Sequence, residues 1–246
     1  MKVVVGTRFF ETREKEISNA GGKILEFCKN SLSAGASQVL VAVNVAQDIS
    51  GALGLPYPNG VMAFPVQPWG NFAMPLNGIL VSGRDQWAAG ANLLIASAEV
   101  VLTAEALATL TAHMDENTLV VGAVLEGHQY EPRLHRPATG RQTPWNTLAL
   151  WNPNLLWRNG GFSILGDGPV NEPENAGVEE VVTIATIQNR REGIAKMVQV
   201  PGQKWDTSGF TGERFAAHEK KMASKNSRPA RQLEIAGLPG PEVLHI

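Results

Sequence analysis

The sequence has a single cysteine, no long apolar run and no large excess of charge of either sign. Cys28 cannot form a disulfide within the chain, and its place in an amphipathic helical segment predicts a buried thiol. No apolar stretch reaches the ~18 residues that a membrane helix requires. With 21 basic and 23 acidic residues the net charge is −2. This balance argues against a dedicated nucleic-acid binder, while small anionic ligands remain compatible with it.

Signals for secretion and for common cofactors are also lacking. Residues 1–6, Met-Lys-Val-Val-Val-Gly, are followed closely by Arg8 and lack the long apolar region and cleavage site of a signal peptide. We therefore expect a cytoplasmic protein. The five histidines show no metal-binding spacing, and no haem, flavin, zinc-cluster or Walker motif is present. At 246 residues, 43% of them hydrophobic and 18% charged, the chain suits one large α/β domain with an appended tail.

The central feature of the sequence is the apolar stretch from Ala91 to Thr103. It predicts a buried strand whose tip carries Glu99, followed by a helix that Thr103 caps. Ligands of open α/β sheets bind beyond the carboxyl ends of the strands, so Ser97 and Glu99 are placed to meet one. The alternative is that Glu99 opens the next helix, where an acid favours the helix dipole.

Strand-like and helix-like segments alternate on both sides of this stretch, which predicts parallel pairs joined by right-handed crossovers. We expect strands over residues 2–6, 38–45, 61–66, 119–125 and 196–200, and helices over 14–33, from about 77 to 89, 103–113 and 177–188. From residue 201 the composition becomes polar, with a basic helical stretch. We therefore divide the chain into a domain over 1–200 and a C-terminal arm over 201–246, which either covers the site or contacts another subunit of a homo-oligomer.

Two further segments have features of binding loops. In the loop before the helix at 77, Gly70 permits close backbone approach to a ligand, and the helix start offers free amide groups to an anion. A loop with a buried Trp69 is the alternative. Trp145, Trp151 and Trp157 are spaced six apart and cannot share one helical face, so some are expected in the core, which leaves at least one free to line a cleft.

The order of these segments resembles the GT-A fold of nucleotide-sugar glycosyltransferases, in particular the family-two-like group. The matching segments are Gly6-Thr7-Arg8, Trp69 to Asn77, Ser97-Ala98-Glu99, Gly160-Gly161-Phe162 and Glu179-Glu180. The resemblance spans about residues 1 to 200 and rests on the order of short motifs. It implies an α/β fold with a mostly parallel, Rossmann-like central sheet flanked by helices.

The resemblance also implies roles for individual residues. It assigns nucleotide binding to Thr7, Arg8, Trp69, Gly70, Asn77 and Ser97. It assigns acceptor binding to Trp145, Asn146, Gly160, Gly161 and Phe162. One acid of the Glu179–Glu180 pair would serve as the base of an inverting reaction; an ordinary pair of acids at a helix start is the alternative.

The metal motif departs from the family pattern, because Ser97 and Glu99 stand where the family has two aspartates. A single carboxylate can hold Mg²⁺ or Mn²⁺ if phosphates and waters complete the shell. His218 is in position to add the C-terminal histidine ligand that some GT-A enzymes use. Without a metal, Arg8, Lys204 or the basic arm would have to neutralise the diphosphate of the donor.

Three functions follow from this resemblance. The first is glycosyl transfer from a nucleotide-diphosphate sugar to an acceptor, in which cations near the departing diphosphate lower the barrier. The second is a sugar nucleotidyltransferase, which expects a glycine-rich loop after the first strand that residues 6–10 lack. The third is a non-catalytic binding protein; the altered metal motif supports it, and the retained Glu179 and Glu180 speak against it.

Overall fold

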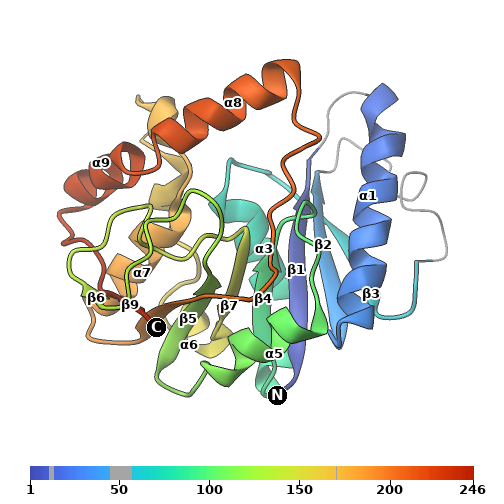
Figure 1. Cartoon of the computed structure of the whole chain (residues 1–246), viewed down its shortest axis with the longest axis horizontal. Helices are drawn as coiled ribbons and strands as arrows, with labels where there is room; N and C mark the ends of the chain where they lie inside the picture. Colours follow the sequence, from blue (N-terminus) through green and yellow to red (C-terminus); the bar gives the residue numbers. More distant parts are fainter. Residues whose placement is uncertain (11–13, 45–56, 170) are drawn as a thin grey trace.

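A single mixed sheet, mostly parallel, forms the centre of the molecule (Figure 1). The computed structural model describes residues 1–10, 14–44, 57–169 and 171–246. Within these residues nine strands pair in the order β3-β2-β1-β4-β7-β5-β8-β9-β6. Pairing is parallel except where β7 lies antiparallel between β4 and β5, and where β6 pairs with β9. The predicted α/β fold with a mostly parallel sheet is confirmed.

The elements have the following bounds. The strands are β1 (Val3–Phe9), β2 (Gln38–Asn44), β3 (Val61–Val66), β4 (Asn92–Ala96), β5 (Thr118–Ala123), β6 (Leu134–His135), β7 (Leu148–Trp151), β8 (Ile194–Val198) and β9 (Val243–His245). The helices are α1 (Glu14–Ser33), α3 (Ala73–Ser82), α4 (Arg84–Ala88), α5 (Ala104–Ala112), α6 (Pro153–Arg158), α7 (Glu179–Gln188), α8 (Gly212–Ala223) and α9 (Ser227–Ala236), with the 3₁₀ helices η1 (Ile164–Asp167) and η2 (Pro173–Asn175).

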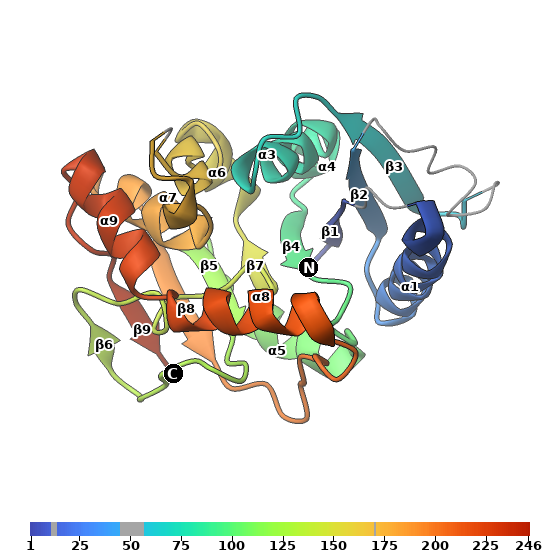
Figure 2. The ribbon, with the colours of Figure 1, turned by 90° about the horizontal axis from the view of Figure 1, so that it is seen from above.

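Helices cover both faces of the sheet, with α1 and α5 on one face and α3, α4, α6 and α7 on the other (Figure 2). Along β1, Val3 and Val5 belong to the core beneath α1 and α5, whereas Val4 belongs to the core beneath α3. This alternation is the period of two expected for a strand buried on both faces. Cys28 of α1 is 1% exposed, and burial raises the pKa of its thiol to about 12. The predicted buried thiol is confirmed.

The topology places a binding crevice at the carboxyl ends of β1 and β4. From β1 the chain moves outward to β2 and β3 and then returns to the other side of β1 to form β4. A reversal of strand order of this kind leaves a crevice between the diverging connections. Helix α8 lies across this end of the sheet (Figures 1 and 2). No helix in the described ranges combines the length and apolar character needed to cross a bilayer.

Several predicted boundaries are corrected by the pairing of the strands. Strand β1 continues past residue 6, because β2 pairs with it as far as Phe9 opposite Val43. Thr7 and Arg8 are therefore strand residues, not loop residues. Strand β4 ends at Ala96, and α5 begins only at Ala104, which rules out the alternative that Glu99 opens this helix. The Thr103 cap is confirmed: its hydroxyl accepts a hydrogen bond from the Ala106 amide at 3.0 Å.

Three strands, β6, β7 and β9, come from segments in which no strand was predicted. The tryptophan-rich stretch contains β7, whose four residues are fully buried between β4 and β5. The last residues form β9, which returns to the sheet beside β8. The segment 201–246, expected as an arm, thus also contributes a strand to the sheet. At four and three residues, β7 and β9 are too short to show a period in the sequence.

Candidate functional site

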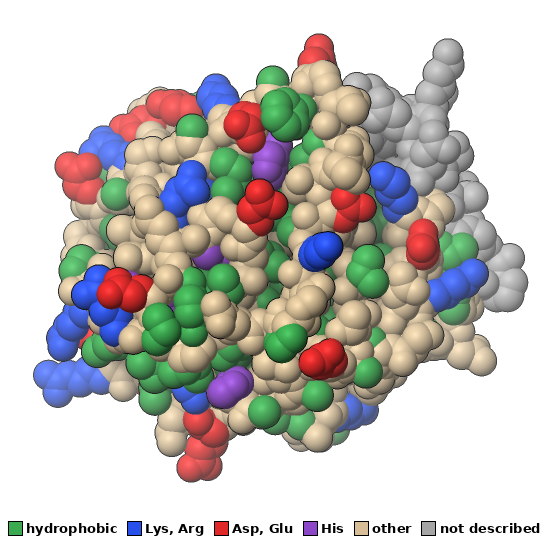
Figure 3. All heavy atoms as spheres, viewed as in Figure 1, with side chains coloured by type: hydrophobic (Ala, Val, Ile, Leu, Met, Phe, Trp, Pro, Cys, Tyr) green, Lys and Arg blue, Asp and Glu red, His purple; other side chains and the backbone are tan. Residues whose placement is uncertain are grey.

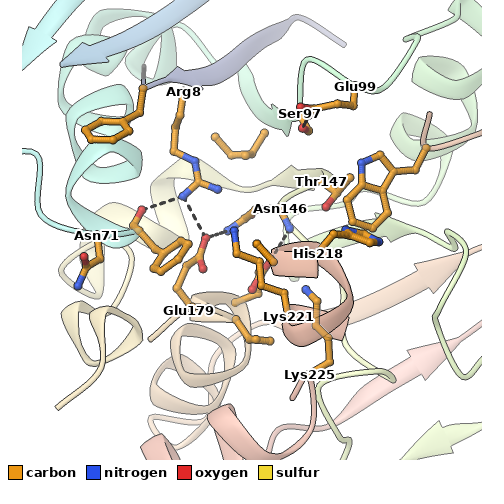
Figure 4. Close-up of a pocket in the computed structure, with 18 of the residues that line it drawn as sticks. Arg8, Asn71, Ser97, Glu99, Asn146, Thr147, Glu179, His218, Lys221 and Lys225 are labelled. Carbon is orange, nitrogen blue, oxygen red and sulfur yellow. Dashed lines mark hydrogen bonds and ion pairs between the residues drawn. The ribbon is translucent and has the colours of Figure 1, made fainter. Parts of the chain in front are cut away.

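One cavity of about 620 Å³ opens at the carboxyl ends of β1 and β4, beneath α8. Its lining residues come from segments far apart in the sequence (Figure 4). It brings together ten of the residues proposed from the sequence: Thr7, Arg8, Trp69, Gly70, Ser97, Glu99, Asn146, Glu179, Glu180 and His218. The predicted convergence of the early Thr7-Arg8 segment, Glu99 and the acidic pair around one cleft is therefore present.

Glu179 is held as an ion pair on one wall of this cavity. Its carboxylate lies 3.4 Å from the guanidinium of Arg8 and accepts a hydrogen bond from the Asn146 side-chain amide at 3.2 Å. Arg8 also donates to the Phe72 carbonyl at 3.0 Å, which fixes the guanidinium between α3 and α7 (Figure 4). Two cationic or polar donors favour the charged form of a carboxyl group.

Glu180 is the most unusual ionisable group of the site. Its side chain is 4% exposed, and one oxygen accepts the Asn146 backbone N–H at 2.5 Å. The other oxygen, Oε2, is buried with no hydrogen-bond partner among the described residues. Burial, and then the neighbouring charge of Glu179, raise the pKa of Glu180 to about 7. An unsatisfied buried carboxyl oxygen is costly, and in native proteins such groups occur at functional sites.

The first turn of α7 is fixed from behind by α9. Val178, which precedes the helix, has a left-handed φ of 61°. The Arg228 guanidinium donates to the Ala176 carbonyl at 2.7 Å, and the Gln232 amide donates to the Gly177 carbonyl at 2.9 Å. These bonds hold the strained turn that points Glu179 and Glu180 at the cavity. No sequence pattern points to Arg228 or Gln232, because their contacts here are with backbone carbonyls.

Two lysines enter the cavity without an acidic partner. Lys221 of α8 and Lys225, just beyond this helix, both line the cavity and extend toward its interior (Figure 4). Among the described residues neither makes an ion pair within 4 Å; the ammonium of Lys225 instead lies 4.0 Å from the Trp145 ring centroid. Burial lowers the pKa of both lysines. Free ammonium groups in a concave site favour an anionic ligand.

Lys221 and Lys225 belong to the basic arm named from the sequence, and their spacing is a further signal. Arg214, His218, Lys221 and Lys225 recur at positions i, i+4, i+7 and i+11, and all four line the cavity. This spacing places residues on one face of a helix. By contrast, Lys204, the cation named from the sequence, is not among the lining residues. On the face of the molecule shown in Figure 3, basic and acidic side chains are interspersed.

Glu99 and His218, predicted as metal ligands, both line the cavity but are engaged with other residues. The Glu99 carboxylate accepts hydrogen bonds from the Ser97 hydroxyl and the Arg214 guanidinium. The His218 ring packs edge-on against Trp205 and Phe210, with centroids 5.1 Å and 5.2 Å away. In the described part of the chain no three His, Cys, Asp or Glu residues gather to hold a metal ion. This arrangement does not fit a bound divalent cation.

The predicted anion site at the start of α3 is also occupied by the protein itself. The Asp167 carboxylate accepts hydrogen bonds from the backbone amides of Phe72 and Ala73, at 2.6 Å and 2.8 Å. A carboxylate that caps the helix satisfies the donors that an anion would use. The expectation of free amides here is therefore wrong. Beside this helix start, the rings of Trp69 and Phe10 lie 5.5 Å apart at the cavity wall.

The remaining predicted residues lie away from the cavity. Asn77, Gly160 and Gly161 line a separate hollow of about 230 Å³. The Asn77 side chain bonds the backbone N–H and carbonyl of Phe162, at 2.8 Å and 2.9 Å, so it holds the Gly-Gly-Phe turn. Phe162 itself is buried, at 1% exposure.

The three tryptophans of the 145–157 stretch divide between core and surface. Trp145 is buried and donates from its indole to the Gly140 carbonyl at 2.7 Å. It lies beside two residues that line the cavity, Lys225 and Trp205. Trp151 is fully buried, and Trp157 is half-exposed at the edge of the smaller hollow. None of the three lines the large cavity.

Comparisons with known proteins find similarity in structure only. No family model and no curated protein matches the sequence. The structure is similar to a crystal structure of a mycobacterial protein, with a TM-score of 0.43 and 11% identity over 77% of this chain and 74% of the other. It is similar to 4-diphosphocytidyl-2C-methyl-D-erythritol synthase from Anaerococcus prevotii DSM 20548, with a TM-score of 0.46 and 10% identity over 94% and 99% of the two chains.

A second structure of 4-diphosphocytidyl-2C-methyl-D-erythritol synthase gives a TM-score of 0.42 and 13% identity over 91% of this chain and 99% of the other. Similarity at this level assigns no activity to the chain.

Proposed function

We propose that this protein transfers a sugar from a nucleoside-diphosphate sugar to a hydroxyl group of an acceptor. The observation that carries the proposal is the composition of one cavity. It holds a buried carboxyl pair, in which one oxygen of Glu180 lacks a partner, together with Lys221 and Lys225, which lack an acidic partner among the described residues. The first feature suits a proton acceptor, and the second suits a departing anion.

The lysines would bind the diphosphate. In a single displacement, the acceptor oxygen bonds to the anomeric carbon while the bond from that carbon to the diphosphate breaks. The diphosphate gains negative charge as it departs, so ammonium groups held beside it lower the barrier. Arg8 and Arg214 are less available for this role, because each is already paired with a glutamate.

The acidic pair would take the proton of the acceptor hydroxyl. A base is most effective when its pKa lies near the working pH, and burial sets the pKa of Glu180 at about 7. Phe10 and Trp69, on the wall of the same cavity, offer flat apolar rings on which a nucleobase can stack. The site therefore supplies groups for each part of the reaction.

The raised pKa of Glu180 favours glycosyl transfer over nucleotidyl transfer. In nucleotidyl transfer the attacking group is a sugar phosphate, which is largely ionised at pH 7 because its second pKa is about 6. Such a nucleophile needs no base. A hydroxyl does need one, and the raised pKa of the buried Glu180 has a use only in that case.

Nucleotide binding is the first test. We expect UDP, GDP or CDP to raise the melting temperature, and calorimetry to give the same affinity in Mn²⁺ and in EDTA. The double variant Lys221→Met and Lys225→Met should lose about tenfold or more in affinity, because charge-assisted hydrogen bonds are lost. Lys220→Met is the matched control, since this exposed lysine of α8 does not line the cavity.

The outcomes separate the three functions. Release of nucleoside diphosphate from a nucleotide sugar, abolished by Glu180→Gln, supports the proposal. Release of pyrophosphate from a nucleoside triphosphate and a sugar phosphate would support nucleotidyl transfer. Failure of every nucleotide to bind would support the non-catalytic protein and overturn the proposal. Binding that requires Mn²⁺ and is lost in Glu99→Ala would restore the metal site predicted from the sequence.

A further inference from the structure

Asn146 connects both glutamates of the pair and is itself held by Trp151. The indole N–H of Trp151 donates to Oδ1 of Asn146 at 2.8 Å. An indole nitrogen can only donate, so this bond identifies the amide oxygen of Asn146 and turns its NH₂ group the other way. Asn146 is 3% exposed and Trp151 is fully buried, so both side chains are largely removed from bulk solvent.

The two donors of Asn146 go to different glutamates. The side-chain amide donates to Glu179 at 3.2 Å, and the backbone N–H donates to Oε1 of Glu180 at 2.5 Å. Glu179 also has Arg8 at 3.4 Å. Glu180 has no second partner, since its Oε2 makes no hydrogen bond to a described residue. One carboxyl thus has a cation and an amide, while the other has a single amide.

We infer that Asn146, locked by Trp151, is a positioning residue that holds Glu179 as the ionised member of the pair and leaves Glu180 as the member that gains and loses the proton. Two buried carboxyl groups this close do not both ionise readily. The donors decide which of them stays charged. The inference deepens the proposed function, because it names the member of the pair that would receive the acceptor proton.

Other charges act on the same pair. Lys225 and Arg228 favour ionisation of both glutamates, and Lys221 interacts with Glu179. These cations belong to the C-terminal segment, whereas Arg8 belongs to β1. None of them donates a hydrogen bond to Glu180. Asn146 is therefore the residue whose loss changes the hydrogen bonding of the pair without a change in its local charge.

The test follows the titration of Glu179 and Glu180 in the absence of any ligand. In the full chain labelled with ¹³C at the glutamate carboxyl, NMR should show one buried carboxyl that titrates near pH 7 and is absent in Glu180→Gln. Asn146→Ala keeps the backbone donor to Glu180 and removes the donor to Glu179. We expect the lower of the two titration steps of the pair to rise by about half a pH unit or more, because ionised Glu179 loses a hydrogen bond. The upper step, near pH 7, should move little, because Glu179 is ionised on both sides of it.

Trp151→Phe should raise the lower titration step in the same direction, because it frees the Asn146 amide to rotate and point its oxygen at Glu179. Trp87→Phe is the matched control. Trp87 is also buried, but its indole donates to the Leu80 backbone carbonyl, at 2.7 Å, and not to Asn146. Trp87→Phe should leave both titration steps unchanged. If Trp151→Phe does not fold, Asn146→Ala decides the question alone.

Two results would overturn the inference: a lower titration step that Asn146→Ala does not move, or a titration near pH 7 that persists in Glu180→Gln and disappears in Glu179→Gln. Neither depends on nucleotide binding. A shifted lower step in a protein that binds no nucleotide would leave the inference intact and end the proposed function.

Discussion

Two acidic segments reach the same cavity in different states. Glu99, beyond β4, is 27% exposed at its side chain and paired with Arg214 and Ser97. Glu180, at the start of α7, is 4% exposed and has one oxygen without a partner among the described residues. Both were candidates in the sequence because both are carboxylates near the end of a predicted element.

The difference shows how a neighbouring residue changes the chemical use of a carboxylate. At the partly exposed rim, the carboxylate of Glu99 is already engaged by an arginine and a hydroxyl. A buried acid that lacks a second partner has its proton affinity raised into the neutral range. We therefore expect the chemistry to depend on Glu180 far more than on Glu99, and the predictions below test this contrast.

The largest expected effect is on catalysis. Glu180→Gln removes the proton acceptor and should lower the transfer rate by about 10²- to 10⁴-fold. Nucleoside diphosphate affinity should stay close to that of the wild type, because the lysines remain. The measurement is nucleoside diphosphate release under saturating donor, beside calorimetric binding. Glu99→Gln is the comparison variant, and an equal loss of rate in it would remove the contrast between the two acids.

The next effect is on stability. Burial raises the pKa of Glu180 from 4.5 to about 7, so the folded state holds its proton more tightly than the unfolded state. This contribution is fully present below about pH 4.5 and is lost as pH rises through about 7. Glu180→Gln should therefore raise the free energy of unfolding at pH 8 by up to about 3 kcal/mol.

Urea unfolding at pH 8 measures this gain, and it should shrink toward zero at pH 4.5. A variant that is no more stable than the wild type at pH 8 would show that Glu180 is not the protonated member of the pair.

A smaller effect is expected in the pH profile of the reaction. The pair must be ionised to accept a proton, so kcat/KM should rise with pH and level off above about pH 7. Below that value it should fall about tenfold per pH unit. Initial rates at low donor concentration test this. A flat profile between pH 5.5 and pH 8 would contradict the use of Glu180 as the base.

The smallest effect is expected for Glu99 itself. Its pair with Arg214 is partly exposed, and exposed pairs contribute about 0 to 1 kcal/mol. Glu99→Gln should change the free energy of unfolding by less than about 1 kcal/mol, as measured by urea unfolding at pH 7. A loss of several kcal/mol would show that the rim pair is as important to the fold as the buried pair.

Most of the fold could be predicted from the sequence, because its signals are local and repeat along each element. The expected bounds of the helix over 14–33 and the strand over 61–66 agree with α1 and β3. The short strands β7 and β9 could not be predicted, since each is a strand only because longer neighbours pair with it. The same reason explains why β1 continues past residue 6.

The candidate site was predictable only in part. Arg8 and Glu99 follow apolar segments, and Glu179 was named from the resemblance to GT-A enzymes; all three line one cavity. Asn77 and the Gly-Gly-Phe turn match a motif, but their polar groups are used by each other. Arg228 and Asn146 act through backbone carbonyls and buried carboxyls that the chain brings near them only after folding.

By itself, the sequence determined the alternation of strands and helices and the presence of acids near the ends of these elements, because periodicity and composition are properties of neighbouring residues. The tertiary structure decided which acid is paired and which is left with a free oxygen. That outcome depends on Arg214 reaching Glu99 from α8 and on Asn146 facing two glutamates more than thirty positions later in the chain. Burial and pairing are set by contacts between distant segments, and they determine the proton affinity of a carboxyl group.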